Sequence, residues 1–308
     1  MIENLFSAFS RMIMRAKLVA KLIILLSVLL SFTVHGATWR ITYPKPMSES
    51  DKRSNYPVKL LSLALEKTGV QYSLMPSERI MLQNKALKRL MDSRDVNVVW
   101  SVTDKQREQQ LLPIRIPIYK GLIGWRLLLI RDDMPARFQY VQKLEHLIKL
   151  IPVQGRDWPD TKVLQANGFN VTADNSYGNL FNLLRRAQGD FFPRSVVEIW
   201  DEIDNPAYNA DLMVEKEIAI RYPEAMYFFV NKKSRPLANL LEQGLEKAIA
   251  DGSFEELFMR TFQDKLNRAK MSSRHVFELE NSFLPSVTPL ERKELWYQFD
   301  DLASGSEK

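Results

Sequence analysis

Segments with the period of a strand alternate with segments with the period of a helix from residue 39 to residue 266, and this order constrains the fold most. Bulky and polar residues alternate from Trp39 to Pro44, as in a half-buried strand. Residues 56–68 follow a helical period and stop before Gly69, where a C-cap glycine is expected. Residues 96–102 and 125–130 are apolar enough for buried strands. This alternation predicts an α/β fold with largely parallel sheets.

The rest of the chain continues the alternation. Further strands are expected at residues 70–75, 151–154, 169–172, 191–193 and 227–230, with an extended segment at 112–119. Further helices are expected at residues 77–90, 160–168, 180–187, 196–203 and 237–266, the last interrupted at Asp251–Gly252. Ser77 and Glu78 are expected to open the first of these helices, with Glu78 in a capping role.

The first 37 residues predict export. Four basic residues between positions 11 and 21 precede an apolar run from Leu22 to Phe32, and small residues follow it. This is the pattern of a secretory signal peptide, with cleavage expected near Gly36 or Ala37. A membrane anchor is the weaker alternative, because a run of 11 residues is shorter than the ~20 that a spanning helix needs.

The absence of cysteine restricts the classes of exported protein to which the chain could belong. With none in the sequence, neither a disulfide framework nor a lipid-anchored cysteine can form. An exported, disulfide-free chain with no later apolar run of spanning length points to a soluble protein of the periplasm.

Composition argues against several classes of function. Removing residues 1–36 takes away four basic residues and one acidic residue, so the net charge falls from +6 to +3 and no basic run suggests nucleic acid. His146 and His275 each stand alone, which leaves a zinc site or a Ser-His-Asp triad without support. Neither GxGxxG nor GxxxxGK[ST] occurs. We therefore expect no cofactor and no metal.

Three stretches resemble the bacterial extracellular solute-binding proteins of family 3, which serve amino-acid uptake. Residues 98–119 (VVWSVTDKQREQQLLPIRIPIY) are similar to a family segment that runs from a strand to an arginine and then to a proline-aromatic end. Residues 153–182 are similar to the ligand loop of the second lobe and the segment after it. Residues 227–262 are similar to the return strand and closing helix, with their Asp-Gly-Ser-Phe turn. The resemblance covers residues 38–265.

The resemblance implies a two-lobed periplasmic-binding-protein-like fold of type II, with two mixed sheets flanked by helices and a hinge of two crossing strands. Lobe 1 would comprise residues 38–123 completed by 226–270, and lobe 2 residues 124–225. Residues 1–37 would be the signal peptide. Residues 271–303 carry enough apolar side chains to pack on the body, and 304–308 read as a disordered tail.

In such proteins the ligand lies between the lobes, and an arginine binds its carboxylate. Ser101, Thr103 and Arg107 match the family motif by type, and a guanidinium suits a carboxylate because it makes two parallel hydrogen bonds. Arg107 lies one residue further along than the family pattern places it. The alternative is a solvated arginine on a polar helix.

A second group of expected ligand residues falls in the other lobe. Gly155 opens a loop before a helix, where backbone N–H groups favour anions, and Arg156, Asp157 and Trp158 replace the family's small hydroxyl residues. Trp158 could stack on a ligand or simply pack locally. Ser176 matches the segment that follows the ligand loop.

The clearest departure from the family lies at Arg194 and Ser195, near the position where an acidic residue holds the ligand's ammonium group. A cation cannot take that role, so an Arg194 that faces the cleft would indicate a ligand with a second anionic group or without an α-amine. The alternative is an Arg194 turned outward into an ion pair with Glu198. Tyr43 and Trp100 stand at the ends of first-lobe strands, where ligands of α/β proteins bind.

These features predict a periplasmic solute-binding protein that captures a small amino-acid-like or anionic solute for an ABC-type uptake system and performs no chemistry. One alternative is a sensory protein that presents its ligand to a membrane receptor rather than to a permease. A weaker alternative is a dehydratase-type enzyme on the same fold, with Glu78 or Asp157 as the general acid. We expect a monomer that does not bind nucleic acid.

Overall fold

The computed structural model describes residues 14, 17–19, 21, 38–48 and 51–299. The chain divides into two compact units, Met1–Thr38 and Trp39–Lys308, and the second is described below. Most of the predicted signal peptide and the whole of the predicted tail, 304–308, lie outside the described residues. Among the described residues, no helix combines the length and the hydrophobicity needed to cross a bilayer.

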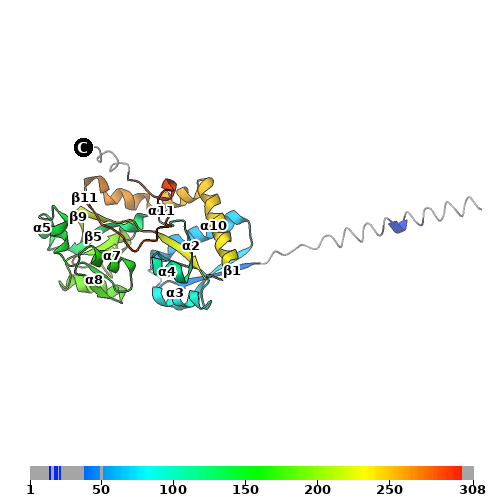
Figure 1. Ribbon diagram of the computed structural model, residues 1–308, viewed down its shortest axis with the longest axis horizontal. Coiled ribbons are helices and arrows are strands. Elements are labelled where there is room, and N and C mark those ends of the chain that lie inside the picture. Colours follow the sequence, from blue (N-terminus) through cyan, green and yellow to red (C-terminus); the bar gives the residue numbers. More distant parts are fainter. Residues whose placement is uncertain (1–13, 15–16, 20, 22–37, 49–50, 300–308) are drawn as a thin grey trace, which may run out of the picture. The chain divides into compact units, whose positions relative to one another are not determined.

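Lobe 1 is built from two groups of strands covered by helices (Figure 1). One group pairs β1 (Trp39–Lys45) in parallel with β2 (Tyr72–Ile80). In the other, β10 (Met226–Val230) lies antiparallel between β3 (Val99–Val102) and β4 (Leu112–Ile114). The helices of this lobe are α2 (Asn55–Thr68), α3 (Gln83–Met91), α4 (Lys105–Gln110) and α10 (Arg235–Ala250).

Local sequence explains why α2 forms and where it packs. Its buried positions recur at helical spacing, and Gly69 ends it in the left-handed region at φ 73°. The buried face lies against α10, where Gly244 comes so close that a Cβ would overlap the backbone carbonyl of Ala64. The two helices therefore depend on a residue without a side chain at their crossing point.

Lobe 2 contains a four-stranded sheet and a second strand pair. The sheet has the order β11-β9-β5-β8, and β6 pairs in parallel with β7. The strands are β5 (Trp125–Arg131), β6 (Val153–Gly155), β7 (Thr172–Asp174), β8 (Phe192–Ser195), β9 (Leu212–Arg221) and β11 (His275–Glu278). The helices are α5 (Pro135–Phe138), α6 (Leu144–Ile148), α7 (Pro159–Ala166), α8 (Tyr177–Arg185) and α9 (Ile199–Ile203).

Two connections join the lobes before residue 253, one before β5 and one between β9 and β10. They touch where Tyr222 N donates to Gly124 O at 3.1 Å. A Cβ at Gly124 would overlap Tyr222 O, so only glycine lets the connections come this close. We refer to residues 119–124 and 222–225 as the hinge.

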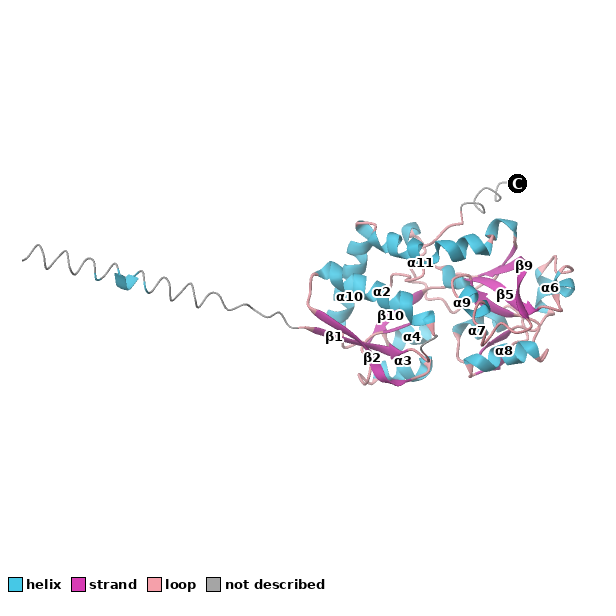
Figure 2. Cartoon of the chain, turned by 180° about the vertical axis from the view of Figure 1, so that it is seen from behind, coloured by secondary structure: helices cyan, strands magenta, loops and turns pink. Residues whose placement is uncertain are grey.

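Helix α11 (Ser253–Ala269) reaches both lobes (Figure 2). Its apolar face packs on lobe 1, where Phe262 stands 4.7 Å from the Tyr56 ring. Its polar face meets α9 of lobe 2 through the ion pair of Lys265 with Asp201 at 2.6 Å. One continuous apolar core accordingly includes buried residues of both lobes.

The α/β class and the two-lobed architecture are confirmed, but three local predictions are wrong. The sheets are mixed rather than largely parallel, because β5 and β10 enter from the opposite lobe and run antiparallel to their neighbours. No helix opens at Ser77 and Glu78, since β2 continues to Ile80. Pro193 does not end β8; it is tolerated because β8 is the edge strand of its sheet.

Candidate functional site

Helix α4 presents Arg107 toward the other lobe. Asp104 caps the helix by accepting from Arg107 N at 2.7 Å, which fixes the first turn. The Arg107 guanidinium then donates through Nη1 to Ser101 Oγ at 2.9 Å and to Val102 O at 2.7 Å. Thr103 does not join them, because its hydroxyl donates to Glu108 Oε1 at 2.8 Å.

Arg107 is a buried cation with weak compensation. It is 9% exposed, and burial lowers the pKa of its guanidinium although several acids lie in the wider surroundings. Its Nη2 reaches only Gln83 Oε1 and Asp157 O, both at 3.5 Å, and Asp104 Oδ2 lies 3.6 Å from Nε. In the described part of the chain, no carboxylate accepts a hydrogen bond from this guanidinium.

A cavity of about 390 Å³ lies beside Arg107, between α3 and α4 of lobe 1 and the start of α7 in lobe 2. Four cationic side chains line it, together with the acids Asp104 and Asp157. The cationic residues are Lys88, Arg107, Arg156 and Lys162. With four cationic and two acidic side chains, the lining carries an excess of positive charge.

The lobe 2 wall of this cavity is a tight loop after β6. Gly155 has no room for a side chain, because a Cβ there would overlap the Trp158 ring. The loop is fastened by Thr161 Oγ1, which donates to Gly155 O at 2.7 Å. Arg156 Nη2 donates to Ala173 O at 2.8 Å, which steadies its side chain at the edge of the cavity.

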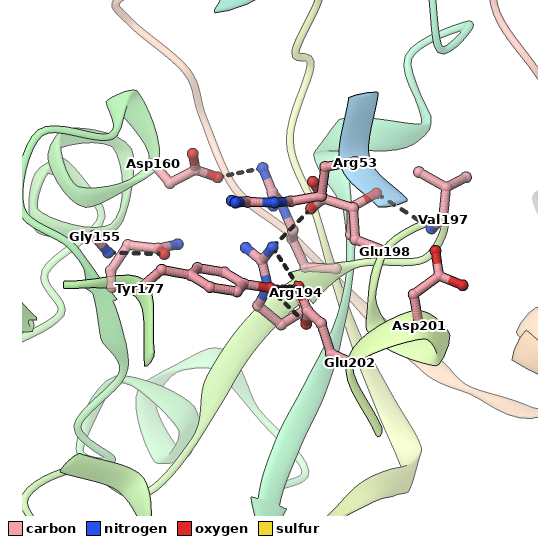
Figure 3. Close-up of polar contacts among 12 residues, drawn as sticks. Arg53, Gly155, Asp160, Tyr177, Arg194, Val197, Glu198, Asp201 and Glu202 are labelled. Carbon is pink, nitrogen blue, oxygen red and sulfur yellow. Dashed lines mark hydrogen bonds and ion pairs between the residues drawn. The ribbon is translucent and has the colours of Figure 1, made fainter. Parts of the chain in front are cut away.

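Arg194 lies in a closed cluster beside this wall (Figure 3). It is 2% exposed, and its Nε and Nη2 donate to Glu202 at 2.7–2.9 Å, while Nη2 also reaches Glu198 at 3.0 Å. Burial opposes its charge, but the two glutamates raise the pKa of the guanidinium well above its usual value. The guanidinium also stands 5.0 Å from the Trp158 ring centroid. Arg194 therefore pairs with Glu198, as in the alternative interpretation of the sequence. Arg194 is buried rather than turned outward, however, and Glu202 is its main partner.

Arg53, which the sequence analysis did not single out, makes a contact between the lobes. Asp51 forks its guanidinium at 2.8 and 2.9 Å, and this guanidinium lies 4.3 Å from the Tyr177 ring of lobe 2. Tyr177 in turn donates its hydroxyl to Glu202 at 2.6 Å. Arg53 is thus coupled to the Arg194 cluster, and no local sequence pattern marks this long-range contact.

A third buried arginine, Arg126, links the hinge to the start of α7. Its Nη2 forms ion pairs with Asp160, at the start of α7, and with Glu224 of the hinge at 2.5 Å. Tyr222 donates its hydroxyl to Asp160 at 2.6 Å. Burial and the nearby Asp160 carboxylate raise the pKa of Glu224 to about 8, against the influence of Arg126.

The structure divides the predicted ligand residues. Arg107, Arg156, Asp157 and Trp158 line the cavity, with Ser101 bonded directly behind Arg107. The Tyr43 and Trp100 ring centroids lie 5.9 Å apart, and neither residue lines the cavity. 

The remaining predicted residues have structural contacts. Ser195 Oγ donates to Leu122 O of the hinge at 3.0 Å, and Ser176 stands exposed at the start of α8. Glu78, weighed as a general acid, is exposed in β2 and does not line the cavity. Among the described residues, no cluster of three or more potential metal ligands occurs.

Comparisons with known proteins identify the fold. No protein-family model and no curated protein matches the chain. A Salmonella typhimurium periplasmic binding protein with high arginine specificity is 15% identical, with a TM-score of 0.55 over 74% of this chain and 100% of its own. A histidine kinase sensor domain with similarity to periplasmic binding proteins is 16% identical, with a TM-score of 0.54 over 74% and 97% of the two chains. The VFT2 domain of Bordetella pertussis BvgS is 13% identical, with a TM-score of 0.58 over 73% and 93%. The chain shares the two-lobed fold of these structures.

Proposed function

We propose that this chain is a periplasmic solute-binding protein that captures a small anionic or zwitterionic solute between its lobes. The observation that carries the proposal is Arg107: a buried cation without a hydrogen-bonded carboxylate, beside a cavity lined by both lobes. An anionic group bound there would accept hydrogen bonds from the buried guanidinium and compensate its charge. Arg107 would fork a carboxylate, and Trp158 would form part of the wall.

The other charges favour a ligand with more than one anionic group. Arg156 and Lys162 of lobe 2 and Lys88 of lobe 1 line the same cavity, and a second anionic group could reach them. Arg194 is less suited to this role, because its Nε and Nη2 are already engaged by Glu198 and Glu202. The proposed ligand class is therefore a dicarboxylate or an acidic amino acid rather than an amine.

The test measures whether residues 39–308 bind any member of a panel of monocarboxylates, dicarboxylates, amino acids and amines. Binding is detected by thermal unfolding and by titration calorimetry. A ligand at 100 times its Kd adds about 2.7 kcal/mol of stability. Arg107→Gln should weaken the binding of an active compound by at least about 30-fold, since it removes one side of a buried charge pair. Arg260→Gln, an exposed arginine on α11, is the matched control.

Two results would contradict the proposal. One is a panel in which amines bind and anions do not. The other is an active anion whose affinity is the same for Arg107→Gln and for the wild type.

A sensory role is the second candidate, because one of the matching structures is a histidine kinase sensor domain. In that case the closed lobes would be read by a membrane receptor rather than by a permease. Neighbouring genes for a permease and an ATPase would favour uptake, and a neighbouring receptor gene would favour sensing. Capture of the mature chain by the encoded membrane partner, with and without an active anion, would then decide between them.

A further inference from the structure

Residues 271–299, which we call the strap, begin as part of lobe 2. Strand β11 pairs in parallel with β9, from His275 opposite Ile218 to Glu278 opposite Arg221. The next amide, Leu279 N, donates to Arg221 O at 2.8 Å. Phe277 and Leu279 are buried in the core of this lobe. The strap is therefore held to lobe 2 by a strand ladder and by apolar packing.

Immediately after β11 the strap crosses to lobe 1. Glu280 exchanges two hydrogen bonds with the Asn167 side chain, at 2.8 and 3.1 Å. Asn281 Nδ2 donates to Pro223 O of the hinge at 2.9 Å. Lys105 of lobe 1 then donates through its backbone N to Phe283 O at 3.2 Å and through Nζ to Ser282 O at 2.9 Å.

These contacts join the two helices that present the proposed ligand residues. Asn167 caps the C-terminal end of α7, whose first turn lines the cavity, and Lys105 is the first residue of α4, which carries Arg107. Glu280 and Phe283 are three positions apart, and a segment of that length spans at most about 11 Å when fully extended. While both contacts hold, the separation of the far end of α7 and the start of α4 is limited by this length.

The strap then returns over the hinge. Arg292 forks Glu246 of α10 at 2.6 and 3.0 Å, and Tyr297 N donates to Lys120 O at 2.8 Å. The Trp296 ring fills the space beside Gly121, where a Cβ would overlap it. Phe299 reaches lobe 2 again, 4.9 Å from the Trp125 ring. Both hinge segments are thus contacted by the strap.

We infer that the strap positions α4 and α7 relative to each other and limits how far the cleft opens. Asn167 and Asn281 are positioning residues in this arrangement. The lobe 2 end is fixed by β11, whereas the first attachment on lobe 1 is two hydrogen bonds to the exposed Lys105. Wider opening therefore begins with release of Ser282 and Phe283 from Lys105, while β11 stays paired.

The absence of cysteine allows a direct test. Spin labels at Lys85→Cys on α3 and Gln165→Cys on α7 report the distance between the lobes without any ligand. The chain with an intact strap should give one narrow distribution. Asn167→Ala with Asn281→Ala should broaden it and add distances longer by about 5 Å or more, the length of one to two released residues. Asn267→Ala, which removes an exposed pair with Gln263 on α11, is the matched control.

A double variant that is folded and gives the same distribution as the wild type would overturn the inference. Hydrogen exchange gives a second readout on the unmodified chain: the Lys105 amide should exchange by a lower-energy opening than the Leu279 amide. Equal exchange of the two amides would also overturn it. Neither measurement involves a ligand, so failure here leaves the proposal about Arg107 untouched.

Discussion

At the scale of the residue, three arginines near the cleft differ in how their charge is compensated. Arg194 forms direct ion pairs with two glutamates, and Arg126 forms one with Asp160 and donates a hydrogen bond to Glu224, so neither needs an external anion. Arg107 is buried to a similar degree but bonds mainly to a hydroxyl and to carbonyl oxygens. Its nearest carboxylate, Asp104, lies 3.6 Å away and accepts no hydrogen bond from the guanidinium, so this residue is the one best placed to gain from an anionic ligand.

The Arg194 cluster leads to a prediction about stability. Arg194→Ala should lower the free energy of unfolding by about 3–5 kcal/mol, because it leaves the buried Glu202 without its main partner. Urea denaturation measures this, with Arg260→Ala as the exposed control that should change little. A loss below about 1 kcal/mol would show that Glu202 is not held as a buried charge.

Glu224 leads to a prediction about pH. Its folded-state pKa is raised from 4.5 to about 8, so between these values the folded chain keeps a proton that the unfolded chain releases. The stability that this group contributes is complete below pH 4.5 and is lost as the pH rises toward 8. In denaturation experiments at several pH values, the free energy of unfolding should fall less steeply with rising pH for Glu224→Gln than for the wild type. Parallel curves would mean that Glu224 is ionised throughout.

Sequence patterns located individual residues better than their partners. The family motif pointed to Arg107, and the structure places it on the cavity with Ser101 behind it. A departure from the family pattern pointed to Arg194 but not to Glu202, whose role depends on the turn that carries α9 back over β8. Arg53 and Arg126 carried no signal at all, because each meets residues more than 30 positions away. Contacts of that kind are fixed by the fold and not by local spacing.

At the scale of the element, the long helices and most strands were predicted, whereas the short helices α4, α5 and α6 and the strands β9 and β11 were not. Helices α2, α10 and α11 have strong apolar periods and glycine at their ends, which are local properties. Strand β9 was not predicted, and β2 was cut short in favour of a helix. Most of the second half of β2 is exposed, so little periodic burial marks it as a strand.

The crossing of α2 and α10 gives a matched pair of glycine substitutions. Gly244→Ala should destabilise the chain by about 1–3 kcal/mol, because its Cβ would overlap the Ala64 carbonyl and push the helices apart. Gly178→Ala, in α8, has open space around the new Cβ and should be neutral or stabilising by up to about 1 kcal/mol. Chemical denaturation of both variants checks the prediction, and equal effects would contradict the close approach of the two helices.

At the scale of the whole folded unit, the two lobes are linked at more places than the hinge. Helix α11 bonds to α9 across the lobes, Arg53 stacks on Tyr177, and the strap contacts both hinge segments. A protein linked in this way should unfold with its lobes strongly coupled. The apolar side chains of residues 271–303 predicted that this segment packs on the rest of the protein, but they did not predict which elements it contacts.

Removing the strap should therefore weaken the whole unit and not only lobe 2. A chain that ends at residue 270 loses β11 and the buried Phe277, Leu279 and Leu295, each worth about 1.5–3 kcal/mol. Compared with a chain that ends at residue 299, it should lose about 5 kcal/mol or more of unfolding free energy. It should also show faster hydrogen exchange at Gly124 and Tyr222, where the hinge segments touch. Packing of the strap and restraint of the hinge affect different amides. If the unfolding free energy falls while exchange at Gly124 and Tyr222 stays the same, the strap stabilises lobe 2 without restraining the hinge.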